Sequence, residues 1–221
     1  MFDSFHCCEF DFNLDVYTRK LKICQKVQYQ KENVKLYLLK FEKWNLDNFE
    51  NMALIIEVQN KKPAFGQSCW LAPNATIVGD VVMGENCTVW FNAVVRGDVN
   101  EIRIGNDTNI QDGAVIHCTY QKAGTYIGNQ VSIAHNAIVH GCTIHDRVLI
   151  GMGAIVMDGA IVNSGAVIAA GAVVLANTVV EANSIYAGMP ARKVKDIGVE
   201  MEAVITRTAK NYPMYASWFQ T

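Results

Sequence analysis

Aliphatic residues return at every sixth position along most of the chain. A period of six fits neither an α-helix, which repeats every 3.6 residues, nor a simple strand, which alternates every two. It is typical of a parallel β-helix, in which each short strand contributes one inward residue to a shared core. The positions are Ile77, Met83, Val89, Val95, Ile104, Ile110, Ile116, Ile127, Ile133 and Val139, and then Ile144, Ile150, Val156, Val162, Ile168, Val174, Val180 and Tyr186.

Polar turn residues separate the aliphatic positions. Glycine, Asn and Asp recur between them, and these residues tolerate the positive φ that a tight bend requires. The period slips twice, because nine positions separate Val95 from Ile104 and eleven separate Ile116 from Ile127. Insertions of this kind in a repeat protein become loops that leave the stack.

The first 51 residues differ from the rest of the chain. The period is absent from them, and all 16 glycines lie after Met52. We therefore expect residues 1–51 to be a dispensable or disordered extension. Residues 52–190 form the β-helix domain in this interpretation, and residues 191–221 form a C-terminal helix and tail. The alternative for 1–51 is a genuine interaction arm with its aromatic residues on a partner.

An apolar stripe at helical spacing marks the C-terminal segment. It consists of Met201, Ile205, Ala209 and Tyr212. Such a stripe predicts an amphipathic α-helix from about Val199 to Tyr212 that packs along the β-helix. Pro213 is expected to end it, because proline has no backbone N–H and disrupts a helix interior.

Composition excludes several classes of partner. The net charge of −2 gives no reason to expect a nucleic-acid ligand. No apolar run reaches the ~20 residues of a membrane span, and the start lacks the basic segment of a signal peptide. The seven cysteines are odd in number and contain no Cys-x-x-Cys pair. Free thiols in a cytoplasmic protein are the expected state.

Four histidines interrupt the repeat. His117 and His140 each follow an aliphatic core position, and His135 lies 18 residues, or three hexads, after His117. Neighbouring coils can therefore bring imidazoles to one level. Three imidazoles are a common zinc set that leaves a fourth position for water, although each histidine alone is more simply a turn residue. His145, beside Asp146, is interpreted as structural.

A polar cluster precedes the histidines. Arg96 and Asp98 are two residues apart and so share one face of an extended strand. Gln111 and Asp112 follow a core position in the next repeat. These residues are either a surface ion pair, worth ~0–1 kcal/mol, with neighbouring polar groups, or they orient the ligands of a metal.

Together these segments resemble the γ-class carbonic anhydrases. The similarity covers roughly residues 60–200 and rests on residues 89–98, 109–113 with His117 after them, 134–141 and 150–154. It implies a left-handed β-helix, a homotrimer and a metal ion at each subunit interface, with carbon dioxide and bicarbonate as substrates. The metal ligands would be His117 and His140 from one subunit and His135 from its neighbour. Three imidazoles suit Zn²⁺, with Fe²⁺ or Co²⁺ as alternatives.

The resemblance implies further site residues. Arg96 and Asp98 match the family's interface ion pair. Gln111 and Asp112 match residues that hydrogen-bond near the catalytic water. Tyr186 matches a tyrosine near the active site. These five residues are therefore our candidates for the groups that surround the metal.

Two features differ from the active members of that family. Val99 stands where they carry a glutamate directly after the Arg-Gly-Asp, and residues 118–126 contain no acid where they carry an acidic loop for proton export. Carbon dioxide hydration releases a proton, so we expect slow turnover. Glu101 is the nearest acid that could substitute.

Two other functions stay open. Residues 187–193 resemble the closing motif of hexapeptide acyltransferases, which favours acyl transfer or thioester hydrolysis with coenzyme A on the same fold. Three histidines disfavour this reading, since an acyltransferase needs only one as a base. The missing shuttle acids also allow a metal-stabilised trimeric scaffold with little turnover.

Overall fold

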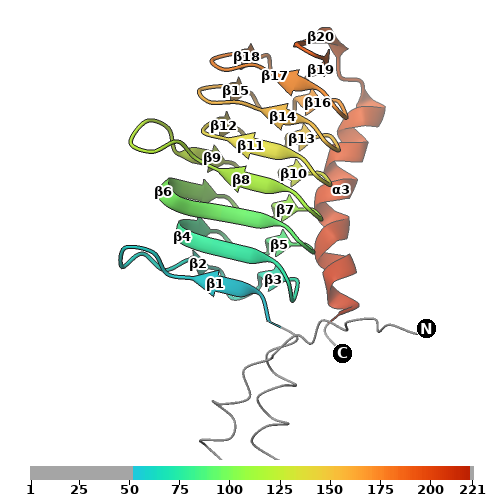
Figure 1. Ribbon diagram of the computed structural model, residues 1–221. Coiled ribbons are helices and arrows are strands. Elements are labelled where there is room, and N and C mark those ends of the chain that lie inside the picture. The colour runs from blue at the N-terminus through green and yellow to red at the C-terminus, as the bar shows by residue number, and fades with distance from the viewer. Residues whose placement is uncertain (1–51, 220–221) are drawn as a thin grey trace, which may run out of the picture. The chain divides into compact units, whose positions relative to one another are not determined.

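The computed structural model describes residues 52–219, so the prediction for residues 1–51 lies outside the described range. Within that range the chain forms short strands wound into coils, followed by the helix α3 (Val199–Ser217). Figure 1 shows the coils stacked along one axis with α3 running beside them. No helix in this part of the chain is long and apolar enough to cross a membrane.

Strands of successive coils pair in parallel and build three faces, joined at corners by turns. The first face consists of β1 (Leu54–Ile56), the starts of β4 (Thr76–Met83) and β6 (Val94–Ile104), β8 (Val115–His117), β11 (Ile138–His140), β14 (Ile155–Val156) and β17 (Val173–Val174). The second consists of β2 (Ala64–Phe65), the ends of β4 and β6, β9 (Thr125–Ile127), β12 (Thr143–Ile144), β15 (Ile161–Val162) and β18 (Val179–Val180).

The third face is a separate sheet. Its strands are β3 (Trp70–Leu71), β5 (Thr88–Val89), β7 (Asn109–Ile110), β10 (Ser132–Ile133), β13 (Leu149–Ile150), β16 (Val167–Ile168), β19 (Ser184–Gly188) and β20 (Ala191–Asp196). Only the last pair, β19 with β20, is antiparallel among the described strand pairs of this face. This hairpin ends the stack before the chain enters α3.

The six-residue period of the sequence corresponds to the packing of the core. Parallel register stacks one inward aliphatic side chain on the next, as with Ile133 and Ile150 on the third face and Ile144 and Val162 on the second. These four side chains are at most 1% exposed. Each such burial contributes ~1.5–3 kcal/mol. The parallel β-helix expected from the period is therefore confirmed.

The two slips of the period have different outcomes. The first does not leave the stack, because β6 runs without a break from Val94 to Ile104 and turns the corner between the first and second faces. The prediction of a loop there is wrong. The second becomes the loop 118–124, which closes with a bridge between Thr119 and Ala123 and stands away from the coils in Figure 1.

The C-terminal helix is longer than predicted. It continues through Pro213 to Ser217, so the expectation that proline ends it is wrong. Proline removes one hydrogen bond, but side chains on both sides of it are held by aromatic packing. The ring of Tyr212 lies 5.2 Å from Trp90, and that of Phe219 lies 5.5 Å from Phe91. These contacts offset the missing bond.

The outer side of the first face is apolar. Its outward column consists of Leu54, Thr76, Val94, Val115, Ile138, Ile155 and Val173. Ile138, near the middle of the column, is 38% exposed. The third face differs, because α3 packs over its strands β5 and β10. The first face is thus a flat apolar surface with polar residues at its corners.

Candidate metal centre

Strand register, and not residue spacing, brings two of the histidines together. β8 and β11 pair so that His117 lies directly opposite His140, 23 residues later. The loop 118–124 lengthens this coil, so the 18-residue interval from His117 to His135 is not a full coil here. The spacing argument that placed His135 one coil after His117 is therefore wrong, and the imidazoles that lie at one level are those of His117 and His140.

The two imidazoles face each other. His117 Nδ1 lies 3.1 Å from His140 Nε2, and the ring centroids are 5.0 Å apart. Both rings stand at the corner where the first face meets the second, directly after the last core residue of each strand. Their side chains are 18% and 34% exposed, respectively. The pair is therefore partly shielded but open on one side.

A carboxylate contacts the outer nitrogen of each ring. His117 Nε2 lies 3.1 Å from Asp98 Oδ1, and His140 Nδ1 lies 2.5 Å from Asp158 Oδ1. An ionised carboxylate only accepts hydrogen bonds, so the outer nitrogens carry the protons. The inner nitrogens, His117 Nδ1 and His140 Nε2, then turn their lone pairs toward the same point.

Burial and nearby charges favour these protonation states of His117 and Asp98. Burial lowers the pKa of His117, and with the nearby Arg96 guanidinium it outweighs the contact with Asp98, which acts to raise that pKa, so the neutral ring is favoured at physiological pH. Burial alone would raise the pKa of Asp98, but hydrogen bonds from Arg96, 2.6 Å away, and from His117 hold it below the usual value. The carboxylate is therefore ionised, as its role as acceptor requires.

The donor set fits a metal ion. A separation of 3.1 Å between two ring nitrogens fits two bonds of about 2.0–2.1 Å to one Zn²⁺ at an angle of about 100°, slightly below the tetrahedral angle. Metal-bound histidines also typically donate their other N–H to a carboxylate. Within residues 52–219, however, no three His, Cys, Asp or Glu side chains converge on one point. The described residues of one chain therefore bring two such donors together, His117 and His140.

The third candidate ligand lies in a second group of polar residues. His135 sits in the turn between β10 and β11, and its Nδ1 lies 2.9 Å from Asp112 Oδ2. Both side chains are more than 40% exposed. Gln111, directly before Asp112, is buried and donates to Asn109 Oδ1 at 2.9 Å. His135 thus repeats the pattern of an imidazole supported by a carboxylate.

The two groups occupy opposite edges of the first face. His135 precedes β11 and His140 ends it. Only Ile138–His140 of this interval is strand, because His135 and Asn136 form the turn before it. His135 is paired with Asp112 of the neighbouring turn, and no three potential metal ligands converge within residues 52–219, so His135 does not join His117 and His140 of its own chain. The apolar outward column of the first face lies between the two groups.

Tyr186 joins neither group. It lies on β19 as the last member of an inward column, opposite Ile168, and is 7% exposed. Three strand spacings separate it from Ile133 in that column, or about 14 Å. Tyr186 is thus a core residue in this chain, and its assignment near the metal has no contact to support it here.

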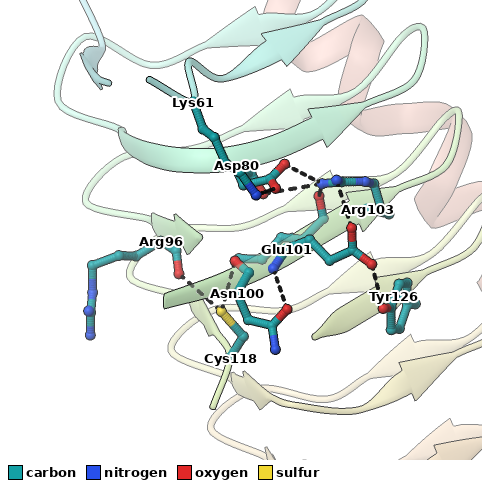
Figure 2. A network of polar contacts seen from close by, with 9 residues as sticks. Lys61, Asp80, Arg96, Asn100, Glu101, Arg103, Cys118 and Tyr126 are labelled. Carbon is teal, nitrogen blue, oxygen red and sulfur yellow. Dashed lines mark hydrogen bonds and ion pairs between the residues drawn. The ribbon is translucent and has the colours of Figure 1, made fainter. Parts of the chain in front are cut away.

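Glu101 is already occupied by other partners. Its Oε2 lies 2.8 Å from Arg103 Nη2, and its Oε1 accepts a hydrogen bond of 2.6 Å from the Tyr126 hydroxyl. Figure 2 shows this network, which continues to Asp80 and Lys61, while the guanidinium of Arg96 points away from it. Both carboxylate oxygens of Glu101 are therefore engaged by partners other than the histidines.

Three residues of the site were not predicted. Asp158 and Thr119 bond to each other, with 2.5 Å between Thr119 Oγ1 and Asp158 Oδ2, and Asp158 bonds to His140. Tyr212 of α3 lies near Asp112: burial, together with the charge of that carboxylate, raises the pKa of Tyr212 to about 12. The 18-residue interval from His140 to Asp158 was the one available signal, since it is one regular coil.

The chain matches a repeat family over part of its length. The model of the family described as bacterial transferase hexapeptide (six repeats) matches residues 65–97 and 141–176. The chain is also similar to the hexapeptide transferase family protein from Anaplasma phagocytophilum. That likeness has a TM-score of 0.72 at 34% identity and covers 75% of this chain and 98% of the other. The left-handed coil expected from the sequence resemblance agrees with these matches.

Curated relatives are more specific. The chain is 53% identical over 142 residues to the probable carbonic anhydrase of Methanocaldococcus jannaschii, covering 64% of this chain and 89% of that protein. It is 37% identical over 163 residues to gamma carbonic anhydrase 1, mitochondrial, of Arabidopsis thaliana, covering 72% of this chain. The match spans 59% of the length of the plant relative.

Proposed function

We propose that this chain, which belongs to the γ-class carbonic anhydrase-like family of hexapeptide-repeat proteins, hydrates carbon dioxide reversibly to bicarbonate at a metal ion. The observation that supports this most directly is the convergence of His117 Nδ1 and His140 Nε2, each on a ring whose outer nitrogen is held by a carboxylate. Two imidazole nitrogens whose lone pairs converge can bind a cation. We propose Zn²⁺ as the ion, with Fe²⁺ or Co²⁺ as alternatives.

The chain's own residues have distinct roles in this proposal. When bound, such a metal ion acidifies water and so supplies hydroxide near neutral pH. Asp98 keeps the metal-facing nitrogen of His117 unprotonated, and Arg96 keeps Asp98 ionised. Asp112 does the same for His135, whose Nε2 is left to bind metal. Gln111 is buried and fixed by Asn109, so its amide can orient the substrate without loss of side-chain entropy.

The metal centre is proposed to form between copies of the chain. His117 and His140 lie at one edge of the first face and His135 at the other, so one copy can complete the centre of the next. Contacts between two different edges are head-to-tail and close into a ring if the rotation allows. We propose a homotrimer, with the apolar first face partly covered by the neighbour. Three centres would then lie at three subunit interfaces.

Subunit mixing tests both the centre and its location. His135→Ala and His140→Ala proteins are prepared separately, and each is expected to bind no stoichiometric metal. The two proteins are then unfolded and refolded together. An interface is complete where a His135→Ala chain supplies His117 and His140 and a His140→Ala chain supplies His135. In an equal mixture about a quarter of the interfaces are complete, so metal content and carbon dioxide hydration should both return to about a quarter of the wild-type level. A mixture that stays metal-free while wild-type protein refolds with metal would contradict the shared centre.

The transferase alternative is supported by one observation. The similar solved structure from Anaplasma phagocytophilum carries the name of the hexapeptide transferase family. Coenzyme A titration separates the alternatives: the anhydrase proposal expects no saturable binding of coenzyme A and full hydration activity in its absence. A scaffold without turnover would bind metal at the mixed interface but would not hydrate carbon dioxide above the buffer rate.

A further inference from the structure

We propose that Asp158, held in place by Thr119, is a positioning residue that fixes the ring orientation and tautomer of His140 for metal binding. This inference rests on the proposed function only in that the bound group is a metal ion. Asp158 lies one coil beyond His140, 18 residues later, and its Oδ1 is 2.5 Å from His140 Nδ1.

The backbone leaves room for this contact at one glycine. Gly141 follows His140 with a φ of +54°, and a Cβ added to it would lie 2.7 Å from Asp158 Oδ1. Any larger residue would push the carboxylate away from the ring. The Gly159 N–H donates to the Gly141 carbonyl at 2.7 Å, so the two turns are also tied by their backbones. The approach of Asp158 to His140 is therefore built into both turns.

The second carboxylate oxygen is held from a different direction. Thr119 Oγ1 donates to Asp158 Oδ2 at 2.5 Å across 39 residues of sequence. Thr119 belongs to the loop 118–124, directly after the strand that carries His117. The loop and the next coil thus hold the carboxylate between them, and both of its oxygens have a fixed partner. A turn aspartate with only a local structural role would need neither contact.

The chemical consequence concerns the competition between a metal ion and a hydrogen bond. With Asp158 in place, His140 carries its proton on Nδ1, and Nε2 offers a lone pair toward His117. Without Asp158, the proton can move to Nε2 and form a hydrogen bond to His117 Nδ1 at the present 3.1 Å. The imidazole pair would then satisfy itself, and a metal ion would have to displace that bond.

The test uses the full chain with Co²⁺ as the probe. We expect Asp158→Ala to weaken Co²⁺ binding by ~10–100-fold, the usual effect of losing a ligand's supporting hydrogen bond. Asp158→Asn keeps an oxygen acceptor for Nδ1 and should recover most of the affinity. The matched control is Asp146→Ala, which removes a turn carboxylate that accepts from Asn129, and it should leave the affinity unchanged.

A second measurement does not depend on metal. Nitrogen-15 chemical shifts of the metal-free protein report which ring nitrogen of His140 carries the proton. Wild type and Asp158→Asn should show the Nδ1–H form, and Asp158→Ala should shift to Nε2–H. An unchanged tautomer in Asp158→Ala, or unchanged Co²⁺ affinity, would overturn the positioning role. Wild-type protein that binds Co²⁺ with this pattern but does not hydrate carbon dioxide would overturn the proposed function and leave the positioning role in place.

Discussion

His117 Nδ1 and His140 Nε2 lie 3.1 Å apart on adjacent coils, although 23 residues of sequence separate them. The strand register of β8 and β11 fixes this distance, so it does not depend on the path of the loop between the two strands. A rigid pair of this kind needs little rearrangement to accept a metal ion. In the proposed centre it would supply two of the three protein ligands before any neighbour is present.

Removing any one of the three histidines should remove the metal. Each of His117→Ala, His135→Ala and His140→Ala is expected to weaken binding by more than the ~10–100-fold that follows the loss of a supporting group, because an open tetrahedral site is held by three protein ligands. Metal per chain after gel filtration, measured by mass spectrometry, reads this directly. His145→Ala is the control, and loss of metal in that variant would contradict the assignment.

Proton export should limit turnover. The loop 118–124 offers no acid, and both carboxylate oxygens of Glu101 are bound to Arg103 and Tyr126. Added imidazole buffer is therefore expected to raise the hydration rate by carrying protons to solvent. Glu101→Gln should change the rate by less than about twofold, far from the ~10²–10⁴-fold effect of losing a general acid or base. A buffer-independent rate that falls in Glu101→Gln would assign the shuttle to Glu101.

The same substitution, Ile→Ala, should destabilise the fold strongly at an inward core position and weakly at an outward position. Ile168 is fully buried on the third face, so Ile168→Ala should cost ~2–5 kcal/mol in the free energy of unfolding. Ile161 points outward from the second face and is 38% exposed, so Ile161→Ala should cost about 0.5 kcal/mol. Urea denaturation of the two variants at equal protein concentration compares them. Equal losses would mean that the inward and outward assignments are wrong.

Asp80 should make the β-helix sensitive to acid. Burial acts to raise its pKa, but hydrogen bonds from Lys61 and Arg103 hold the pKa below the usual value of 3.8. A carboxyl with a lowered folded pKa stabilises the fold fully above its unfolded pKa, and this contribution is lost as pH falls through the folded pKa. Asp80→Asn should thus be less stable by ~1 kcal/mol above pH ~5. Urea unfolding should show this difference shrink once the pH falls below about 4 and vanish only below the lowered folded pKa of Asp80.

Residues 1–51 should be dispensable for folding and metal binding. They contain neither the period nor any of the 16 glycines, so we do not expect them to supply a layer of the stack. A protein that begins at Met52 is expected to keep the circular dichroism spectrum and the metal content of the full chain. Aggregation or metal loss in the shortened protein would support the interaction-arm alternative.

The inward positions could be predicted from the sequence, because alternation along a strand determines which side of the sheet each residue faces. Ile144 and Ile150 could be assigned to the core from spacing alone, and they are buried. The pairing of His117 with His140 was harder to predict from the sequence. It depends on how many residues of this coil lie in the loop 118–124 and not in its strands and turns. The helix end was missed because local proline chemistry was outweighed by packing against Trp90.

The supporting carboxylates were the hardest part to foresee. Asp158 stands in a turn, where Asp and Asn are common for reasons of backbone conformation, so its type alone indicates no contact with an imidazole. Only the stacked coil reveals that its two oxygens meet His140 and Thr119. Tyr212 could be assigned to the apolar stripe of a helix from the sequence. Its position near Asp112 depends on the rotation of α3 about its own axis, which the sequence pattern does not give.

The placement of His135 and His140 at opposite ends of β11 also determines how many metal centres of the proposed ring are lost when one subunit is defective. A chain that lacks both residues spoils the two junctions it touches and leaves one of three intact. In a random mixture, each junction needs two sound contributors, so working centres decline as the square of the sound fraction. An equal mixture of sound and defective chains would therefore keep only about a quarter of its centres.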